Sequence, residues 1–327
     1  MNLTSSARSV SPGTGLRDAF ARHEWLGLLI ALVAGVVVMA VLRDAFLSSF
    51  NVYVMLVAFS LSVLVALSQM IILAIGQLNL SVGAIGGLAA VAFAGAMEVF
   101  GLPIPLAVLV GLAVGLGGGF LNGFVTHRSG LNAFIVTLAT LAIFKGINTG
   151  LTEAQPFYGI PDAVKWFGNA RLGPFPLLLV VSGTIAFGAG IVLSRTVAGR
   201  HLLAVGGNAH AAELSGIDVG RVIVLAHVAS GALAATAGML AVARLQLGQP
   251  TIGDDWLILS FAAPVIGGAV LAGGHVSVIG TCLGVALIVL INNALVLLGV
   301  DPFAVQLLLG VLILMAVALS RFRERAR

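Results

Sequence analysis

The side chains that could perform covalent chemistry are few in this chain, and their spacing matches no catalytic or metal site. Asp254 and Asp255 form a pair of carboxylates, as acid–base catalysts often do, but they stand at the start of an apolar run, where acids stabilise a helix N-terminus. The six histidines contain no HxxH or HxxxH pair, and no Ser-His-Asp or Cys-His arrangement can be argued. Cys282, the single cysteine, cannot form an internal disulfide.

Nucleotide chemistry has no support in the sequence either. The chain has no G-x-x-x-x-G-K-[ST] loop, and its only lysines are Lys145 and Lys165. It therefore lacks the usual glycine-loop and lysine cradle for nucleotide phosphates. We expect a protein that is not an enzyme and that binds no metal or cofactor by itself.

The remaining chemistry belongs to neutral polar side chains inside apolar segments. Polar groups in hydrocarbon are costly, so they face a cavity or a neighbouring helix. Amides and hydroxyls suit a neutral, hydroxyl-rich solute, whereas an ion-coupled carrier would more often carry buried carboxylates, which the predicted span interiors lack. Hydrogen bonding between helices is the alternative for each residue. The candidates for a translocation path are Asn79, Ser81, Asn132, Thr137, Asn292 and Asn293.

The elements that must position these groups are membrane-spanning helices. Apolar residues make up 60% of the chain and charged residues 9%, and the mean hydropathy is +1.15, whereas soluble domains average about 25% charged residues. Segments of about 20 apolar residues are the length a bilayer requires. The sequence predicts an all-α polytopic membrane protein with about ten transmembrane helices, at 25–42, 51–73, 80–98, 103–126, 132–150, 174–194, 221–243, 255–271, 276–297 and 302–320. The short segments 80–98 and 255–271 leave eight or nine full spans as the alternative.

The charges predict the orientation of these spans. Most of the 16 Lys and Arg lie in the N-terminal segment, the 127–131 turn, the 195–221 loop and the C-terminal tail. The opposite loops carry mostly acids, so both termini are predicted to be cytoplasmic. This gives a cytoplasmic segment at 1–24, a membrane domain at 25–320 with a cytoplasmic loop at 195–220, and a basic tail at 321–327. The sequence has no basic face with interleaved aromatic residues, so nothing in it indicates nucleic-acid binding.

Two polar breaks suggest a weak internal repeat. IGQLNLSVG (75–83) and AGGHVSVIG (272–280) each place a glycine-containing polar stretch before Ser-Val, and a Gly-x-Pro-like turn follows each about 20 residues later. Transporter folds are often built from internal repeats, with the solute route at broken helices near the repeat interface.

The 199–221 loop reads GRHLLAVGGNAHAAELSGIDVGR and predicts one short helix. Asn208 is a good N-cap, AHAAEL is rich in helix formers, and Gly216 can take the left-handed position that ends a helix. A helix of two turns at most is marginal in water. Its small side chains suit docking against another surface, and a simple connector is the alternative.

GGNAHAAELSGI (206–217) resembles the cytoplasmic coupling loop of permease subunits of bacterial ABC importers in the ribose, arabinose and xylose branch. The likeness continues in order through GQLNLSVGAIGGLAA (76–90), FIVTLATLAIFKGINTGLT (134–152), SGALAATAGML (230–240), the run around ARLQLGQP (243–250), IGGAVLAGGHVSVIGTCLG (266–284) and NNALVLLGVDPFAVQLLLGVLIL (292–314). It covers about residues 50–320 and does not specify the solute.

The resemblance implies a permease fold in the bacterial cytoplasmic (inner) membrane and several partners. These are a second permease copy or paralogue, a separate ABC ATPase that binds ATP and Mg, and an extracytoplasmic solute-binding protein. The 208–217 helix would dock on the ATPase, with Ala211 and Ala212 in contact. The residues implied in coupling are Gly206, Gly207, Asn208, Ala211, Ala212, Glu213, Ser215, Gly216 and Ile217.

The implied solute is a monosaccharide or a similar small, neutral, polar molecule. The same architecture could carry a nucleoside, autoinducer-2 or a branched-chain amino acid, and a self-sufficient secondary carrier is the alternative from another class. The chain departs from the family pattern at Gln77, Asn79, Lys145 and His275, where glycine, aspartate, arginine and arginine are usual. Loss of the aspartate argues against a charge-dependent role for position 79.

Overall fold

The computed structural model describes residues 25–300 together with Leu307 and Gly310. Seven of its helices are long and apolar enough to cross a membrane, and α4 and α12 are shorter apolar helices. The long ones are α2 (Trp25–Leu42), α3 (Ser49–Ala74), α5 (Ile104–Ser129), α6 (Ala133–Thr152), α8 (Leu177–Arg195), α11 (Val219–Leu245) and α13 (Val278–Leu297); the short ones are α4 (Val82–Glu98) and α12 (Trp256–Ile266). The all-α membrane fold is therefore confirmed.

Nine of the ten predicted helices have counterparts in these elements. The tenth, at 302–320, lies outside the described residues, as do the segments at 1–24 and 321–327. The largest difference is in α12, which was expected to reach residue 271 and ends at Ile266. Gly268 follows it with a φ of 91°, a left-handed conformation that an α-helix cannot continue through.

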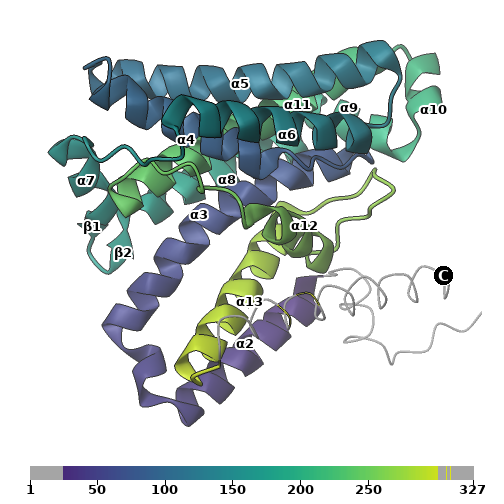
Figure 1. The fold of residues 1–327 in the computed structure, drawn as a ribbon. Helices are drawn as coiled ribbons and strands as arrows, with labels where there is room; N and C mark the ends of the chain where they lie inside the picture. Colours follow the sequence, from purple (N-terminus) through teal and green to yellow (C-terminus); the bar gives the residue numbers. More distant parts are fainter. Residues whose placement is uncertain (1–24, 301–306, 308–309, 311–327) are drawn as a thin grey trace, which may run out of the picture.

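The connecting segments gather at opposite ends of the bundle (Figure 1). At one end lie α9 (Val197–Gly207) and α10 (Ala209–Leu214). At the other lie α7 (Asp162–Asn169) and the hairpin of β1 (Arg171–Leu172) and β2 (Phe175–Pro176), which pair antiparallel. A 3-10 helix, η1 (Asp44–Leu47), joins α2 to α3. The sequence predicted one short helix in the 195–221 loop, and the structure has two.

Close helix packing explains much of the high glycine content. Four glycines on α5 recur at every fourth position, and three of them face α11 backbone or Cβ atoms: Gly115, Gly119 and Gly123. A Cβ at Gly119 would overlap the carbonyl oxygen of His227, and a Cβ at Gly231 would overlap that of Gly115. Small residues at such spacing let transmembrane helices approach closely. The pair α5–α11 is thereby fixed as one wall of the bundle.

Helix α3 is the central element of the fold. Its second half, from Val63 to Ala74, is buried except for the half-buried Ile71, and it packs against α8, α11, α12 and α13. Near its start, α13 packs beside it and α2 packs on α13, away from α5 and α6 (Figure 1). Large apolar side chains such as Val41, Phe187 and Leu109 are exposed on the outside of the bundle. An apolar exterior around a buried core is what a protein that lies in lipid requires.

Candidate functional site

The short helix α10 is built by the capping residues that the sequence predicted. The Asn208 side chain accepts a hydrogen bond from the backbone N–H of Ala211 at 3.0 Å. At the other end Gly216 has a φ of 82°. The N–H of Gly216 donates to the Glu213 carbonyl at 2.9 Å, and the N–H of Ile217 donates to the Ala212 carbonyl at 3.1 Å. This pair of bonds is a Schellman motif, which requires the left-handed residue.

The two faces of α10 have different surroundings. Ala212 is 5% exposed and packs in an apolar cluster with Ile72 of α3, Val205 of α9 and Ala226 of α11. Of the two alanines expected to contact a partner, only Ala211 is therefore on the outer face. The other predicted coupling residues that are exposed are Gly207, Asn208, Glu213, Ser215 and Gly216, whereas Gly206 and Ile217 are half-buried.

Sequence reasoning missed the largest apolar side chain on the exposed face. Leu214 is 78% exposed at the last turn of α10. A leucine in a short helix usually indicates a core position, so its type gave no signal. The structure shows that Ala212 takes the buried face and that Leu214 points away from the protein.

The paired glycines before α10 sit at a contact between three loops. A Cβ at Gly206 would overlap the Ala74 carbonyl at the end of α3, and one at Gly273 would meet the backbone of Gly76 at 2.6 Å. The N–H of Gly274 donates to the Ala74 carbonyl at 3.0 Å. The two polar breaks of the weak repeat therefore touch each other, and the end of α9 touches both.

Several candidate path residues form one buried hydrogen-bond network between helices. Asn122 of α5 donates to the Ser81 hydroxyl at 2.7 Å and accepts from the Thr140 hydroxyl of α6 at 2.7 Å. The Ser81 hydroxyl donates to the Asn79 side-chain oxygen at 2.8 Å, and the Asn79 amide donates to the Ser230 hydroxyl of α11 at 3.3 Å. The network ties the 76–81 segment to three helices.

Two further contacts fix the same segment from its other sides. The Gln69 side chain of α3, oriented to satisfy both its atoms, donates to the Asn79 carbonyl at 3.0 Å and accepts from its N–H at 3.2 Å. The Thr137 hydroxyl of α6 accepts from the Leu80 N–H at 3.1 Å. Asn79, Ser81 and Thr137 are 0% exposed. In this conformation these three residues bond to protein, because their buried groups need partners.

The other three candidate path residues lie apart from the network. Asn132 is exposed and caps α6 by accepting from the Phe134 N–H at 2.9 Å. Asn293 of α13 and Asn51 of α3 exchange two amide hydrogen bonds, at 2.7 and 3.0 Å. The Asn292 side-chain oxygen is buried without a hydrogen-bond partner. Asn292 is thus the member of the set with unused capacity to bind another group.

The buried pair of His227 and Gln77 escaped sequence reasoning. His227 of α11 is 0% exposed, and its Nε2 lies 3.0 Å from the Gln77 side-chain oxygen, while its Nδ1 has no partner. Two features of the sequence could have indicated this pair: Gln77 stands where the resembled family usually has glycine, and His227 lies inside an apolar run. The pair adds a second side-chain link between α11 and the 76–81 segment, beside the one from Asn79 to Ser230.

A different set of contacts closes the opposite end. Lys145 of α6 forms an ion pair with Asp254 at 3.0 Å, with both side chains about half exposed. The Asn148 amide donates to the Pro250 carbonyl at 2.9 Å. Asp255 takes the N-cap position of α12 without a side-chain bond. These contacts fasten the segment before α12 to α6. Among the described residues, no group of three or more His, Cys, Asp or Glu is placed to hold a metal.

Comparison with known proteins gives a consistent set of relatives. Residues 51–317 match the family described as branched-chain amino acid transport system / permease component. The ribose import permease protein RbsC of Bacillus subtilis is 35% identical over 300 residues, which cover 90% of this chain and 92% of RbsC. The L-arabinose transport system permease protein AraH of Escherichia coli is 31% identical over 339 residues, 100% of this chain and 99% of AraH. The D-allose transport system permease protein AlsC of Escherichia coli is 33% identical, with 85% of each chain covered. No solved structure gives a significant match.

Proposed function

Because this chain belongs to the family of branched-chain amino acid transport system permease components, we propose that it forms the translocation path of an ATP-driven importer for a monosaccharide. The observation that carries the proposal is the likeness, over 85% or more of the chain, to permeases named for ribose, L-arabinose and D-allose. The protein is a multi-pass inner-membrane permease subunit and not an enzyme.

The buried polar residues favour a neutral solute. Among the described residues, every fully or nearly fully buried polar side chain except His227 is an amide or a hydroxyl. A sugar needs such donors and acceptors and no counter-charge, whereas an amino acid presents two charges. A nucleoside or autoinducer-2 stays an alternative of the same architecture, and a self-sufficient carrier is disfavoured by the family.

The proposal includes partners that complete the importer. An ABC ATPase and an extracytoplasmic solute-binding protein are implied by the family. We place ATP and Mg on the ATPase, because this sequence has no phosphate-binding loop. We also propose that two permease chains, either two copies or paralogues, assemble around the path.

Coupling is proposed to run from α10 to the centre of the bundle. The exposed face of α10, with Ala211 and Leu214, docks on the ATPase. Its buried face transmits movement because Ala212 packs against Ile72 near the end of α3. The segment that follows α3 carries Asn79 in the buried network. Displacement of α10 would therefore act on the broken segment before α4.

The solute route is proposed to follow the broken helices α4 and α12. Asn79, Ser81, Asn132, Thr137, Asn292 and Asn293 stay the candidates for this route. Asn292 is the one with a buried, unpartnered oxygen. Asn79, Ser81 and Thr137 would contact solute only when the network opens, since their groups bond to protein in this conformation.

Uptake by the complete importer tests the proposed solute. The permease, its ATPase and its binding protein are expressed in cells that lack their own pentose and hexose importers. Radiolabelled ribose, arabinose and allose are then compared with leucine and adenosine. We expect uptake of one sugar and none of leucine. Leucine or adenosine uptake without sugar uptake would assign the chain to one of the alternative solutes.

A further inference from the structure

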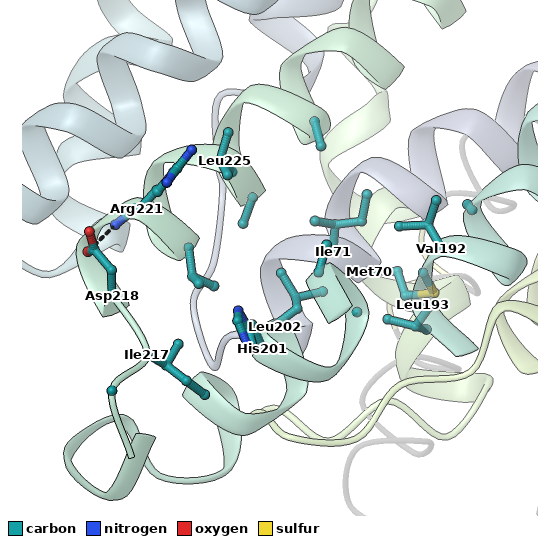
Figure 2. A pocket seen from close by; sticks show the side chains of 17 residues that line it. Met70, Ile71, Val192, Leu193, His201, Leu202, Ile217, Asp218, Arg221 and Leu225 are labelled. Atoms are coloured by element: carbon teal, nitrogen blue, oxygen red, sulfur yellow. Dashed lines mark hydrogen bonds between the residues drawn. The ribbon is translucent and has the colours of Figure 1, made fainter. Parts of the chain in front are cut away.

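An open apolar groove lies at the inner end of the bundle, next to the coupling helix (Figure 2). Its volume is about 610 Å³, within the range of about 300–1,000 Å³ found for small-molecule sites. Helices α3, α8, α9 and α11 form its walls, with apolar side chains such as Met70, Leu193, Leu202 and Leu225. The segment between α10 and α11 closes one side through Ile217.

The polar side chains that line the groove are His201, Asp218 and Arg221. Figure 2 places Arg221 and Asp218 at one side, with Val192, Leu193 and Met70 at the other. One Asp218 oxygen accepts from the Arg221 backbone N–H at 2.9 Å, so this carboxylate serves as the cap of α11. Among the described residues, no carboxylate forms an ion pair with the Arg221 guanidinium.

The groove is apolar within the bilayer, and its two charged lining residues, Arg221 and Asp218, lie at the boundary, where Asp218 caps α11. Arg195 is the last residue of α8 and Arg221 lies in the first turn of α11, so both mark the inner edge of their spans. Arg195 and Arg200 do not line the groove, but they are exposed on α8 and α9, two of the helices that form its walls, and add positive charge there. The apolar wall, including Val192 and Leu225, continues into the spans. An occupant that fits has an anionic head at the boundary and an apolar chain inside.

We propose that this groove binds an anionic phospholipid of the cytoplasmic leaflet. Its acyl chain fills the apolar part, and its phosphate contacts the Arg221 guanidinium and the His201 ring. Basic sites between transmembrane helices on the cytoplasmic side recognise anionic headgroups. Because Gly216 and Ile217 line the groove, the bound lipid contacts the residues that end α10. The inference rests on the membrane orientation and does not depend on which solute is carried.

Native mass spectrometry of the purified chain tests the headgroup part. The detergent-solubilised protein is titrated with phosphatidylglycerol and with phosphatidylcholine of the same acyl chains. We expect tighter binding of phosphatidylglycerol, weakened about fivefold by Arg221→Gln, as the removal of one cation near an anionic lipid predicts. The control is Arg128→Gln, which changes an exposed arginine at the inner end of α5, outside the groove, and is expected to bind like the wild type.

Filling the groove tests the acyl-chain part. Ala189→Phe places a ring in the groove from α8, whereas Ile191→Phe changes an exposed residue of α8 that does not line it. Only Ala189→Phe is expected to lose lipid, with melting temperatures confirming that both variants fold. Equal binding of the two lipids, or equal effects of the paired variants, overturns the proposal. Competition by glycerol phosphate that is as strong as competition by the lipid also overturns it. A dimer that only Ala189→Phe dissociates would do the same, because the groove would then be occupied by a second copy of the chain.

Discussion

Leu214 on the exposed side of α10 offers the sharpest test of the coupling proposal. Leu214→Ala removes three carbon atoms, and burial of such groups contributes about 0.8 kcal/mol each, or about 2 kcal/mol in all. Because Leu214 is 78% exposed in the free chain, most of this energy becomes available only when a partner covers the side chain. A loss of about 2 kcal/mol lowers affinity about 30-fold. The stability of the permease itself should hardly change.

The assay is binding of the purified ATPase subunit to the purified permease, followed by solute uptake in the complete importer. Leu131→Ala is the matched control, because Leu131 is 51% exposed on the predicted cytoplasmic side, in the turn between α5 and α6. We expect weak binding for Leu214→Ala and normal binding for Leu131→Ala. If both variants bind the ATPase like the wild type, the exposed face of α10 is not the docking surface.

Ala212 is a poor site for that test, although the sequence pointed to it. Replacement by arginine would put a charge among Ile72, Val205 and Ala226. An unpaired buried charge costs several kcal/mol, so α10 would lose its packing against α3, α9 and α11 of the same permease. Loss of ATPase binding in Ala212→Arg would then report local unfolding and not a lost contact.

Further predictions concern the cap, the buried network, the ion pair and the missing motor. A side chain at Gly216 would meet no neighbouring atom, so the cost of a substitution there comes from its φ of 82°. Gly216→Val should therefore weaken ATPase binding through backbone strain of about 1–3 kcal/mol. Gly216→Asn should bind normally, because asparagine tolerates the left-handed region. Asn122→Leu leaves two buried hydroxyls short of partners and should lower stability by about 1–2 kcal/mol in thermal melts; an unchanged melting temperature would contradict the network. Lys145→Met should lower the stability by at most about 1 kcal/mol in the same melts, because the ion pair with Asp254 is half exposed. A larger loss of stability would contradict this small contribution. The purified chain alone should hydrolyse no ATP in a phosphate-release assay, and sustained hydrolysis would overturn its assignment as a subunit without a motor.

The local features of the fold could be predicted from sequence because they depend on neighbouring residues. Span length follows from apolar runs, and the caps at Asn208 and Gly216 follow from residue type. The predicted end of α12 was wrong because the apolar run continues past Gly267 and Gly268. Hydropathy carries no information about the left-handed backbone at Gly268. The second loop helix, α9, was missed because its Gly199 and Gly206 read as breaks, whereas each allows close contact with other backbone.

The candidate path residues show what sequence could not supply. Residue type correctly marked Asn79, Ser81 and Thr137 as buried polar groups. Two of their partners, Asn122 and Ser230, lie 41 and 151 residues away along the chain, and no local pattern carries that information. A buried amide that hydrogen-bonds to protein and a buried amide that is left free to bind solute have the same residue type in the sequence. The distinction requires the hydrogen-bond partners.

The glycine contact behind α10 suggests how one docking event could reach both polar breaks. Gly206, in the last turn of α9, lies against the Ala74 carbonyl, and Gly76 and Gly273 meet backbone to backbone. Side chains at these positions would hold the loops apart, so the three segments could not share one contact. A push on α10 would therefore move the breaks before α4 and before α13 together. These two breaks are the pair that the sequence suggested as a weak internal repeat, and the contact between them would let both change position in the same step.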